Sequence, residues 1–186
     1  MRPVHWVGAL ALLLLAGCGM HDLVLRVDIL SFTPQLQSSL TIGPVPAVPG
    51  GLASGELPLV ADETVNLVEG LGSAVNVKDV SLRIRTATSA TSGSGTDTLR
   101  VYTSDAGTAP RTTTPVLTQV LAFTTSRSDT VTTEISQNAQ LIQLFTAKTL
   151  RVSITMSGRG PNAGSPLNGS LRVLALDAVV VAGRKL

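Results

Sequence analysis

The stretch SLRVLALDAVVVA, residues 170–182, decides the fold of this 186-residue chain. Its aliphatic and β-branched side chains fall at both odd and even positions, so both faces of an extended strand are apolar. Such a strand is typical of the middle of a sheet covered on both sides. Asp177 interrupts the run, and a buried carboxylate has to be paired, for which Arg172 or Arg26 is available. We therefore expect a central C-terminal strand and a structural role for Asp177.

Upstream of this stretch, apolar and polar residues alternate repeatedly, which predicts further strands. We expect strands at 22–32, 64–68, 74–87, 98–103, 116–124, 130–135 and 150–156, with an edge strand near 39–42. Within 74–87 the apolar phase changes from odd at Val77 to even at Val80. A one-residue change of phase predicts a β-bulge near Lys78 and Asp79. The Ser/Thr/Gly-rich residues 88–96 are expected to form a hairpin loop.

Two segments depart from this strand pattern. Residues 34–58 are rich in proline and glycine, which exclude a helix or a central strand, so we expect an extended, irregular segment there. Residues 137–147 carry apolar side chains at helical spacing, with Ser136 or Asn138 available as N-cap. This spacing predicts one short helix.

Eight or nine strands joined by turn-forming residues predict an all-β protein. We expect an antiparallel β-sandwich, Ig-like or jelly-roll-like, with a barrel as the related possibility. The sequence contains no repeat and no sign of a second domain. A single β-sandwich domain is therefore expected over residues 22–186, with the proline- and glycine-rich segment at 34–58.

The first 18 residues have the architecture of a secretory signal peptide. Arg2 gives a short positive region, residues 7–15 are apolar, and small residues precede the single cysteine of the chain, Cys18. The apolar stretch is too short to span a membrane comfortably. The tetrapeptide Leu15-Ala16-Gly17-Cys18 resembles the lipobox of bacterial lipoproteins. The resemblance is confined to residues 1–18.

This resemblance implies an anchor and an address. In that family a peptidase removes the leader, here residues 1–17, and the cysteine sulfur, here that of Cys18, carries a diacylglyceryl group. Residues 18–21 then form the lipidated anchor, and two or three acyl chains such as palmitate hold a protein stably on a membrane. Gly19 stands where an aspartate commonly retains such proteins at the inner membrane, so the outer membrane is favoured if the organism has one. A strand from residue 22 places the domain close to the bilayer.

Composition argues against most kinds of chemistry. The chain has 14 basic and 12 acidic residues, and this near-neutral balance offers no broad field for nucleic acid. His21 is the one histidine beyond the leader, and its place beside the anchor suits neither a catalytic triad nor an ordinary zinc site. The scarce aromatic residues disfavour stacking on sugars or bases. Asp62 and Glu63 are interpreted as solvated rather than calcium-binding. We expect that the protein is not an enzyme and that it has no cofactor and no metal site.

One group of side chains is a candidate interaction face. We expect Arg83, Arg85, Arg100 and Tyr102 to point away from the core on the strands that flank residues 88–96. If these strands pair, the four side chains share one face, joined by Arg151. Such a face suits an anionic envelope polymer or the acidic surface of a partner protein. Solvated arginines on a sheet exterior are the simpler interpretation, which we favour.

Two functions remain open at this stage. The first is a non-enzymatic, lipid-anchored envelope protein that supports or assembles some structure through protein contacts. The alternative is a binding protein that holds a small apolar or lipid ligand inside the sandwich or barrel. A filled interior favours the first function, and an open cavity favours the second.

Overall fold

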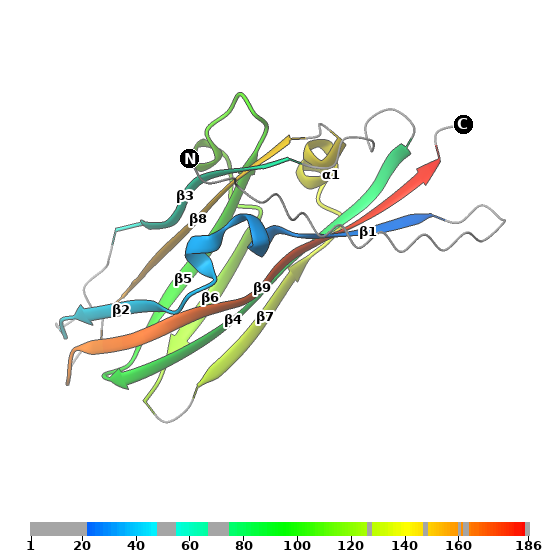
Figure 1. Ribbon diagram of the computed structural model, residues 1–186. Coiled ribbons are helices and arrows are strands. Elements are labelled where there is room, and N and C mark those ends of the chain that lie inside the picture. Colours follow the sequence, from blue (N-terminus) through cyan, green and yellow to red (C-terminus); the bar gives the residue numbers. More distant parts are fainter. Residues whose placement is uncertain are drawn as a thin grey trace, which may run out of the picture.

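A computed structural model describes residues 22–47, 55–66, 75–125, 128–146, 149–159, 161 and 164–184. Within these ranges nine strands form two antiparallel sheets, with one α-helix, α1 (Ala139–Thr146), beside them (Figure 1). The five-stranded sheet contains β1 (Leu23–Asp28), β2 (Leu40–Val45), β4 (Val75–Ser92), β7 (Asp129–Ile135) and β9 (Leu167–Arg184). The four-stranded sheet contains β3 (Leu57–Asn66), β5 (Gly95–Ser104), β6 (Leu117–Phe123) and β8 (Thr149–Arg159). The predicted antiparallel β-sandwich is confirmed.

The C-terminal strand β9 is central, as its sequence predicts. It pairs with β4 along one side and with both β1 and β2 along the other. Its pairing with β4 shifts by one residue at Leu174, so Val173 and Leu176 both face the interior despite their opposite parity. The apolar side chains at both odd and even positions of β9 are therefore explained in part by this bulge, which changes the parity of the residues that face the core. The expectation that both faces are covered is wrong, because Leu174 is 37% exposed on the outer face.

Strand β4 contains the bulge that its change of phase predicts. Its register with β9 shifts between Val77 and Asp79, leaving Lys78 as the extra residue. Val77 and Val80 are therefore both buried although their positions differ in parity. This bulge keeps the apolar residues of a long strand on the core side.

The predicted hairpin loop over residues 88–96 is wrong. Strand β4 continues to Ser92 and β5 begins at Gly95, so the connection is a turn at Gly93 and Ser94. Gly93 has a positive φ of 65°, a conformation that glycine adopts readily. The polar residues before the turn are interior strand residues: Thr86 donates to Gln119 Oε1 (3.1 Å) and Thr88 donates to the carbonyl of residue 122 (2.6 Å). The sequence does not reveal this part of β4 as a strand, because its interior side chains are polar and their hydroxyls form hydrogen bonds with the other sheet.

Residues near the start of the domain follow the prediction in part. The expected strand over 22–32 ends at Asp28 as β1 and continues as a 3-10 turn, η1 (Ile29–Phe32), followed by another, η2 (Pro34–Leu36). The edge strand expected near 39–42 is β2. The segment 34–58 is irregular only in part, because β3 already begins at Leu57 and extends to Asn66. Residues 67 and 68 of the expected strand 64–68 lie outside the described residues.

Helix α1 forms where the apolar spacing predicts it. Asn138 is the N-cap, and its Oδ1 accepts the N–H of Leu141 at 3.1 Å. Leu141, Leu144 and Phe145 are buried on the side of the helix that faces β4 and β8. The helix therefore closes one end of the interior between the two sheets.

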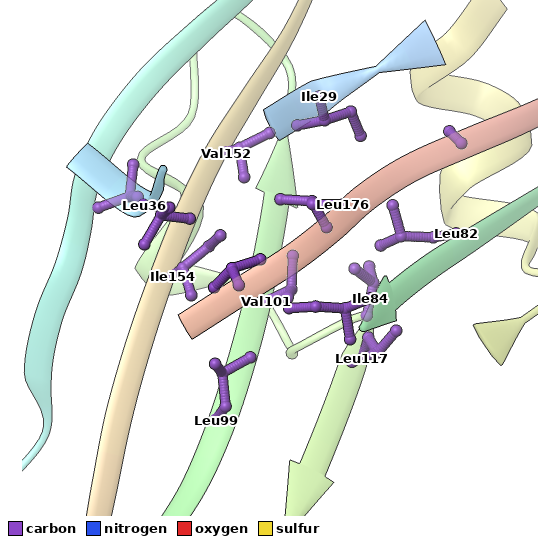
Figure 2. Packing of buried hydrophobic residues seen from close by; sticks show 14 of the residues in the cluster. Ile29, Leu36, Leu82, Ile84, Leu99, Val101, Leu117, Val152, Ile154 and Leu176 are labelled. Carbon is purple, nitrogen blue, oxygen red and sulfur yellow. The ribbon is translucent and has the colours of Figure 1, made fainter. Parts of the chain in front are cut away.

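The interior side chains of both sheets form one apolar cluster (Figure 2). Ile84 and Leu176 come from the five-stranded sheet, and Leu99 and Ile154 come from the four-stranded sheet; all four are fully buried. Ile29 and Leu36, from η1 and η2, extend the cluster where η1 contacts β9 and β3 and η2 contacts β3. Each fully buried side chain of this size contributes about 1.5–3 kcal/mol. This core holds the two sheets together and fixes which side chains face outward.

Candidate functional site

The two-sheet topology divides the predicted arginine face. Arg83 and Arg85 lie on β4 in the five-stranded sheet, whereas Arg100 and Tyr102 lie on β5 in the four-stranded sheet. All four side chains point away from the interior, as predicted, because their neighbours along each strand belong to the core. The two sheets present their outer surfaces on opposite sides of the sandwich. The prediction that these residues share one face is therefore wrong, and two separate clusters exist.

The first cluster surrounds Asp177 on the outer face of the five-stranded sheet, and we call it the Asp177 cluster. Arg83 donates two hydrogen bonds to Asp177 Oδ1, from Nε at 3.3 Å and from Nη2 at 3.0 Å. Arg26 Nη2 lies 3.2 Å from Oδ2, close enough for an ion pair but without hydrogen-bond geometry. The Asp177 side chain is only 5% exposed. The structural role expected for Asp177 thus involves Arg26, one of the two predicted partners, together with Arg83.

Strand register explains this arrangement. Asp177 lies directly between Asp28 on β1 and Arg83 on β4, and Glu134 on β7 follows Arg83 in the same row. The row therefore contains one like-charge pair, Asp28 and Asp177, and two opposite-charge pairs, in which Arg83 lies between Asp177 and Glu134. Facing residues in a sheet interact directly. Arg172, the other predicted partner, lies opposite residue 87, several residues further along β9, and is exposed.

Arg85 belongs to the same outer face but has different surroundings. Its cross-strand neighbours are Ala175 on β9 and Thr132 on β7, and its side chain is exposed. Of the four candidate residues, Arg85 thus remains the one with an exposed guanidinium among small neutral neighbours.

The second cluster lies on the outer face of the four-stranded sheet and surrounds Glu56, so we call it the Glu56 cluster. Glu56 Oε1 accepts hydrogen bonds from Arg100 Nη1 at 3.1 Å and from the Tyr102 hydroxyl at 2.9 Å. Arg111, from the 3-10 turn η3 (Pro110–Thr112), lies 3.5 Å from Oε2. Arg100 also donates to the Ser157 hydroxyl at 2.6 Å. These contacts join the start of β3 and the β5–β6 connection to the middle of the sheet.

Tyr102 is buried, which differs from the exposed position expected for a binding face. Its side chain is 7% exposed, and burial raises the pKa of its hydroxyl above the ordinary value of 10.0. The hydrogen bond and the negative charge of Glu56 raise this pKa further. Tyr102 therefore remains a neutral hydrogen-bond donor at physiological pH.

Arg151 also lies on the four-stranded sheet. It pairs with both carboxylate oxygens of Asp62 on β3, and its Nη1 donates to the backbone carbonyls of residues 106 and 108 at 3.3 and 3.0 Å. It thus holds the β5–β6 connection against β8, an inner strand of this sheet. Asp62, interpreted as solvated from the sequence, is an ion-pair partner.

Asp97 is a third acid with an unusual environment. It lies on the interior side of β5 with Leu99, directly opposite Gly158 on β8, and it is 8% exposed. A Cβ at Gly158 would overlap the Asp97 carboxylate, so this glycine leaves the space that the acid fills. Burial raises the pKa of Asp97 above its ordinary value of 3.8.

Sequence reasoning missed two members of these clusters, Glu56 and Arg111. Glu56 lies in the proline- and glycine-rich segment, and Arg111 lies in a long connection, so neither belongs to an alternating pattern. Their roles depend on how these connections fold back over the sheet. Cys18 and His21 lie outside the described residues. Within the described ranges, no group of three or more metal-ligating side chains occurs, and none of the helices is long and apolar enough to cross a membrane.

Comparison with known proteins gives little information. No protein-family model matches the sequence, and no curated protein matches it. A chain from the structure of the infectious bursal disease virus Gt strain is 13% identical, with a TM-score of 0.40 over 89% of this chain and 38% of that chain. A chain from the T13 IBDV viral particle is 12% identical, with a TM-score of 0.43 over 88% and 36% of the two chains. This protein spans less than half the length of either, and a similarity of this size carries no argument about function.

Proposed function

We propose that this protein is a lipid-anchored protein of the bacterial cell envelope with a structural or protein-interaction role. The observation that carries the proposal is the short distance in sequence between Cys18 of the lipobox-like motif and the first strand, β1, which begins at Leu23. Five residue steps of extended chain span at most about 18 Å. A lipid on Cys18 therefore holds the β-sandwich next to the membrane, which is the outer membrane if the organism has one.

The pairing of arginines with carboxylates inside the domain supports a non-enzymatic role. Two of the three arginines of the candidate interaction face pair with acids of the same chain, Arg83 with Asp177 and Arg100 with Glu56. These pairs join strands and connections to one another. Arg85 is the candidate that stays available for an anionic envelope polymer or an acidic protein surface.

The packing of the interior favours this role over the alternative of ligand storage. Side chains from both sheets, from α1 and from the two 3-10 turns near β1 belong to one buried cluster. An apolar ligand inside the sandwich would have to displace side chains from this cluster, such as Ile84 and Ile154, which are fully buried.

The anchor is tested by changing Cys18 to Ser in the full chain and labelling cells with a fatty-acid analogue. We expect the label to disappear from the protein and an uncut or soluble form to accumulate, because lipid transfer requires the sulfur. Undiminished labelling of the variant would contradict the proposal. Crosslinking in intact cells, followed by purification, then identifies what the domain contacts.

A further inference from the structure

The start of β1 exposes apolar side chains at one tip of the sandwich. Leu23 is 42% exposed and Val24 is 62% exposed, on opposite faces of the strand. Val24 lies directly beside the half-buried Val181 of β9. In Figure 1 the start of β1 and the end of β9 lie together at the right-hand side. We call this part, Leu23, Val24 and Val181, the apolar tip.

The polar groups around the apolar tip suit a lipid headgroup region. Lys78, the extra residue of the β4 bulge, reaches this end of the sheet, and its side chain is 51% exposed. Its Nζ lies 2.5 Å from Asp22 Oδ1, and this salt bridge neutralises the acid that precedes Leu23. Asp79, a second acid beside the tip, lies opposite Val181, and its Oδ1 accepts the backbone N–H of Gln137 at 2.8 Å. Exposed apolar side chains beside a flexible lysine are typical of surfaces that rest at a membrane interface, where the amine reaches phosphate groups.

We propose that the apolar tip rests in the headgroup region of the bilayer, so that β9 runs toward the membrane, from Leu167 at the far end of the sandwich to Val181 at the tip. This inference rests on the proposed lipid anchor. The five steps from Cys18 to Leu23 reach at most about 18 Å. The opposite end of β9, at Leu167, lies 14 residues from Val181, or about 45 Å of strand. The length of the tether therefore selects the tip, and not the far end, as the part that meets lipid.

Two valines make a matched test. Val24 on β1 is 62% exposed, and Val120 on β6 of the other sheet is 64% exposed. Val120 pairs with Thr98, three residues after the start of β5, and so lies toward the end of the sandwich opposite the tip. In the lipidated full-length protein the sulfur of Cys18 is blocked, so Val24→Cys and Val120→Cys each supply one free thiol for an environment-sensitive dye.

The two labelled proteins are reconstituted in vesicles of phosphatidylethanolamine and phosphatidylglycerol that contain a headgroup-attached nitroxide quencher. We expect several-fold stronger quenching, with a blue-shifted emission, for the dye at position 24 than for the dye at 120. Equal quenching at the two positions in protein whose lipid is verified by mass spectrometry would overturn the orientation and leave the anchor intact. Absence of lipid on Cys18 would overturn the anchor, and the orientation with it.

Discussion

The Asp177 cluster and the Glu56 cluster contain the same kinds of side chain, one carboxylate and two arginines, on opposite faces of the sandwich. Each places one carboxylate between two arginines, yet the Asp177 side chain is 5% exposed and the Glu56 side chain is 31% exposed. A half-exposed ion pair contributes little to stability because water already solvates both charges. A buried carboxylate depends on its partners, since the removal of one leaves a desolvated charge uncompensated. Pairing of a carboxylate with two arginines therefore contributes more to the free energy of unfolding at Asp177 than at Glu56.

The largest expected effect comes from Arg83. We expect Arg83→Ala to lower the free energy of unfolding by about 2–3 kcal/mol, because Asp177 loses both of its hydrogen bonds and retains only the exposed Arg26. Urea denaturation followed by circular dichroism measures the change. Arg111→Ala, which removes one arginine from Glu56, is the matched control and should cost at most about 1 kcal/mol. Equal costs for the two variants would show that burial does not separate the clusters.

Asp97 extends the comparison to a buried acid whose pKa is shifted by burial. Its folded-state pKa is raised, so the folded protein binds more protons than the unfolded one above pH 3.8, and stability falls as pH rises through the folded-state pKa. Asp97→Asn should remove this fall and stabilise the protein at neutral pH by about 1 kcal/mol. Urea denaturation at a series of pH values measures both effects. An unchanged pH dependence in the variant would show that Asp97 titrates normally.

Glu56→Gln tests how much the partly exposed Glu56 cluster contributes to stability and to the pKa of Tyr102. We expect a stability loss of at most about 1 kcal/mol, because these charges are partly solvated. The pKa of Tyr102 should fall toward 10.0 but stay above it, since the negative charge is lost while burial remains. Tyr102 is the one tyrosine of the chain, so tyrosinate absorbance during an alkaline titration reports on it alone. A Tyr102 pKa that does not move would contradict the contact with Glu56.

Arg85 should give the smallest effect on stability. We expect Arg85→Gln to change the free energy of unfolding by about 0.5 kcal/mol or less, because its side chain is exposed beside Ala175 and Thr132. Capture of an anionic envelope partner in the crosslinking experiment should nevertheless decrease, and wild-type capture should weaken with added salt. Unchanged capture would mean that Arg85 is only solvated.

Local patterns in the sequence predicted features that depend on neighbouring residues. The change of phase near Lys78 located a bulge, the apolar spacing around Leu141 located the helix, and the apolar run around Asp177 located the central strand. Each follows from the periodicity of side chains in one element.

Features that depend on long-range pairing were not predictable from the sequence. Residues such as Thr88 resembled a loop because the carbonyl that satisfies the hydroxyl belongs to a strand 34 residues away. The assignment of β4 and β5 to different sheets separated Arg83 from Arg100, and no periodicity within either strand contains that information. Glu56 and Arg111 meet only because two connections fold over the same sheet.

The pairing of β1 with β9 has a mechanical consequence. β1 enters the sandwich from the tip and is antiparallel to β9 over all six of its residues, from Leu23 opposite Ala182 to Asp28 opposite Asp177. A force that pulls on the chain before Leu23, along the axis of the strand, loads these hydrogen bonds together in shear. The same force applied sideways would open them one pair at a time. A protein tethered at this end therefore resists being drawn away from its attachment more strongly along β1 than across it.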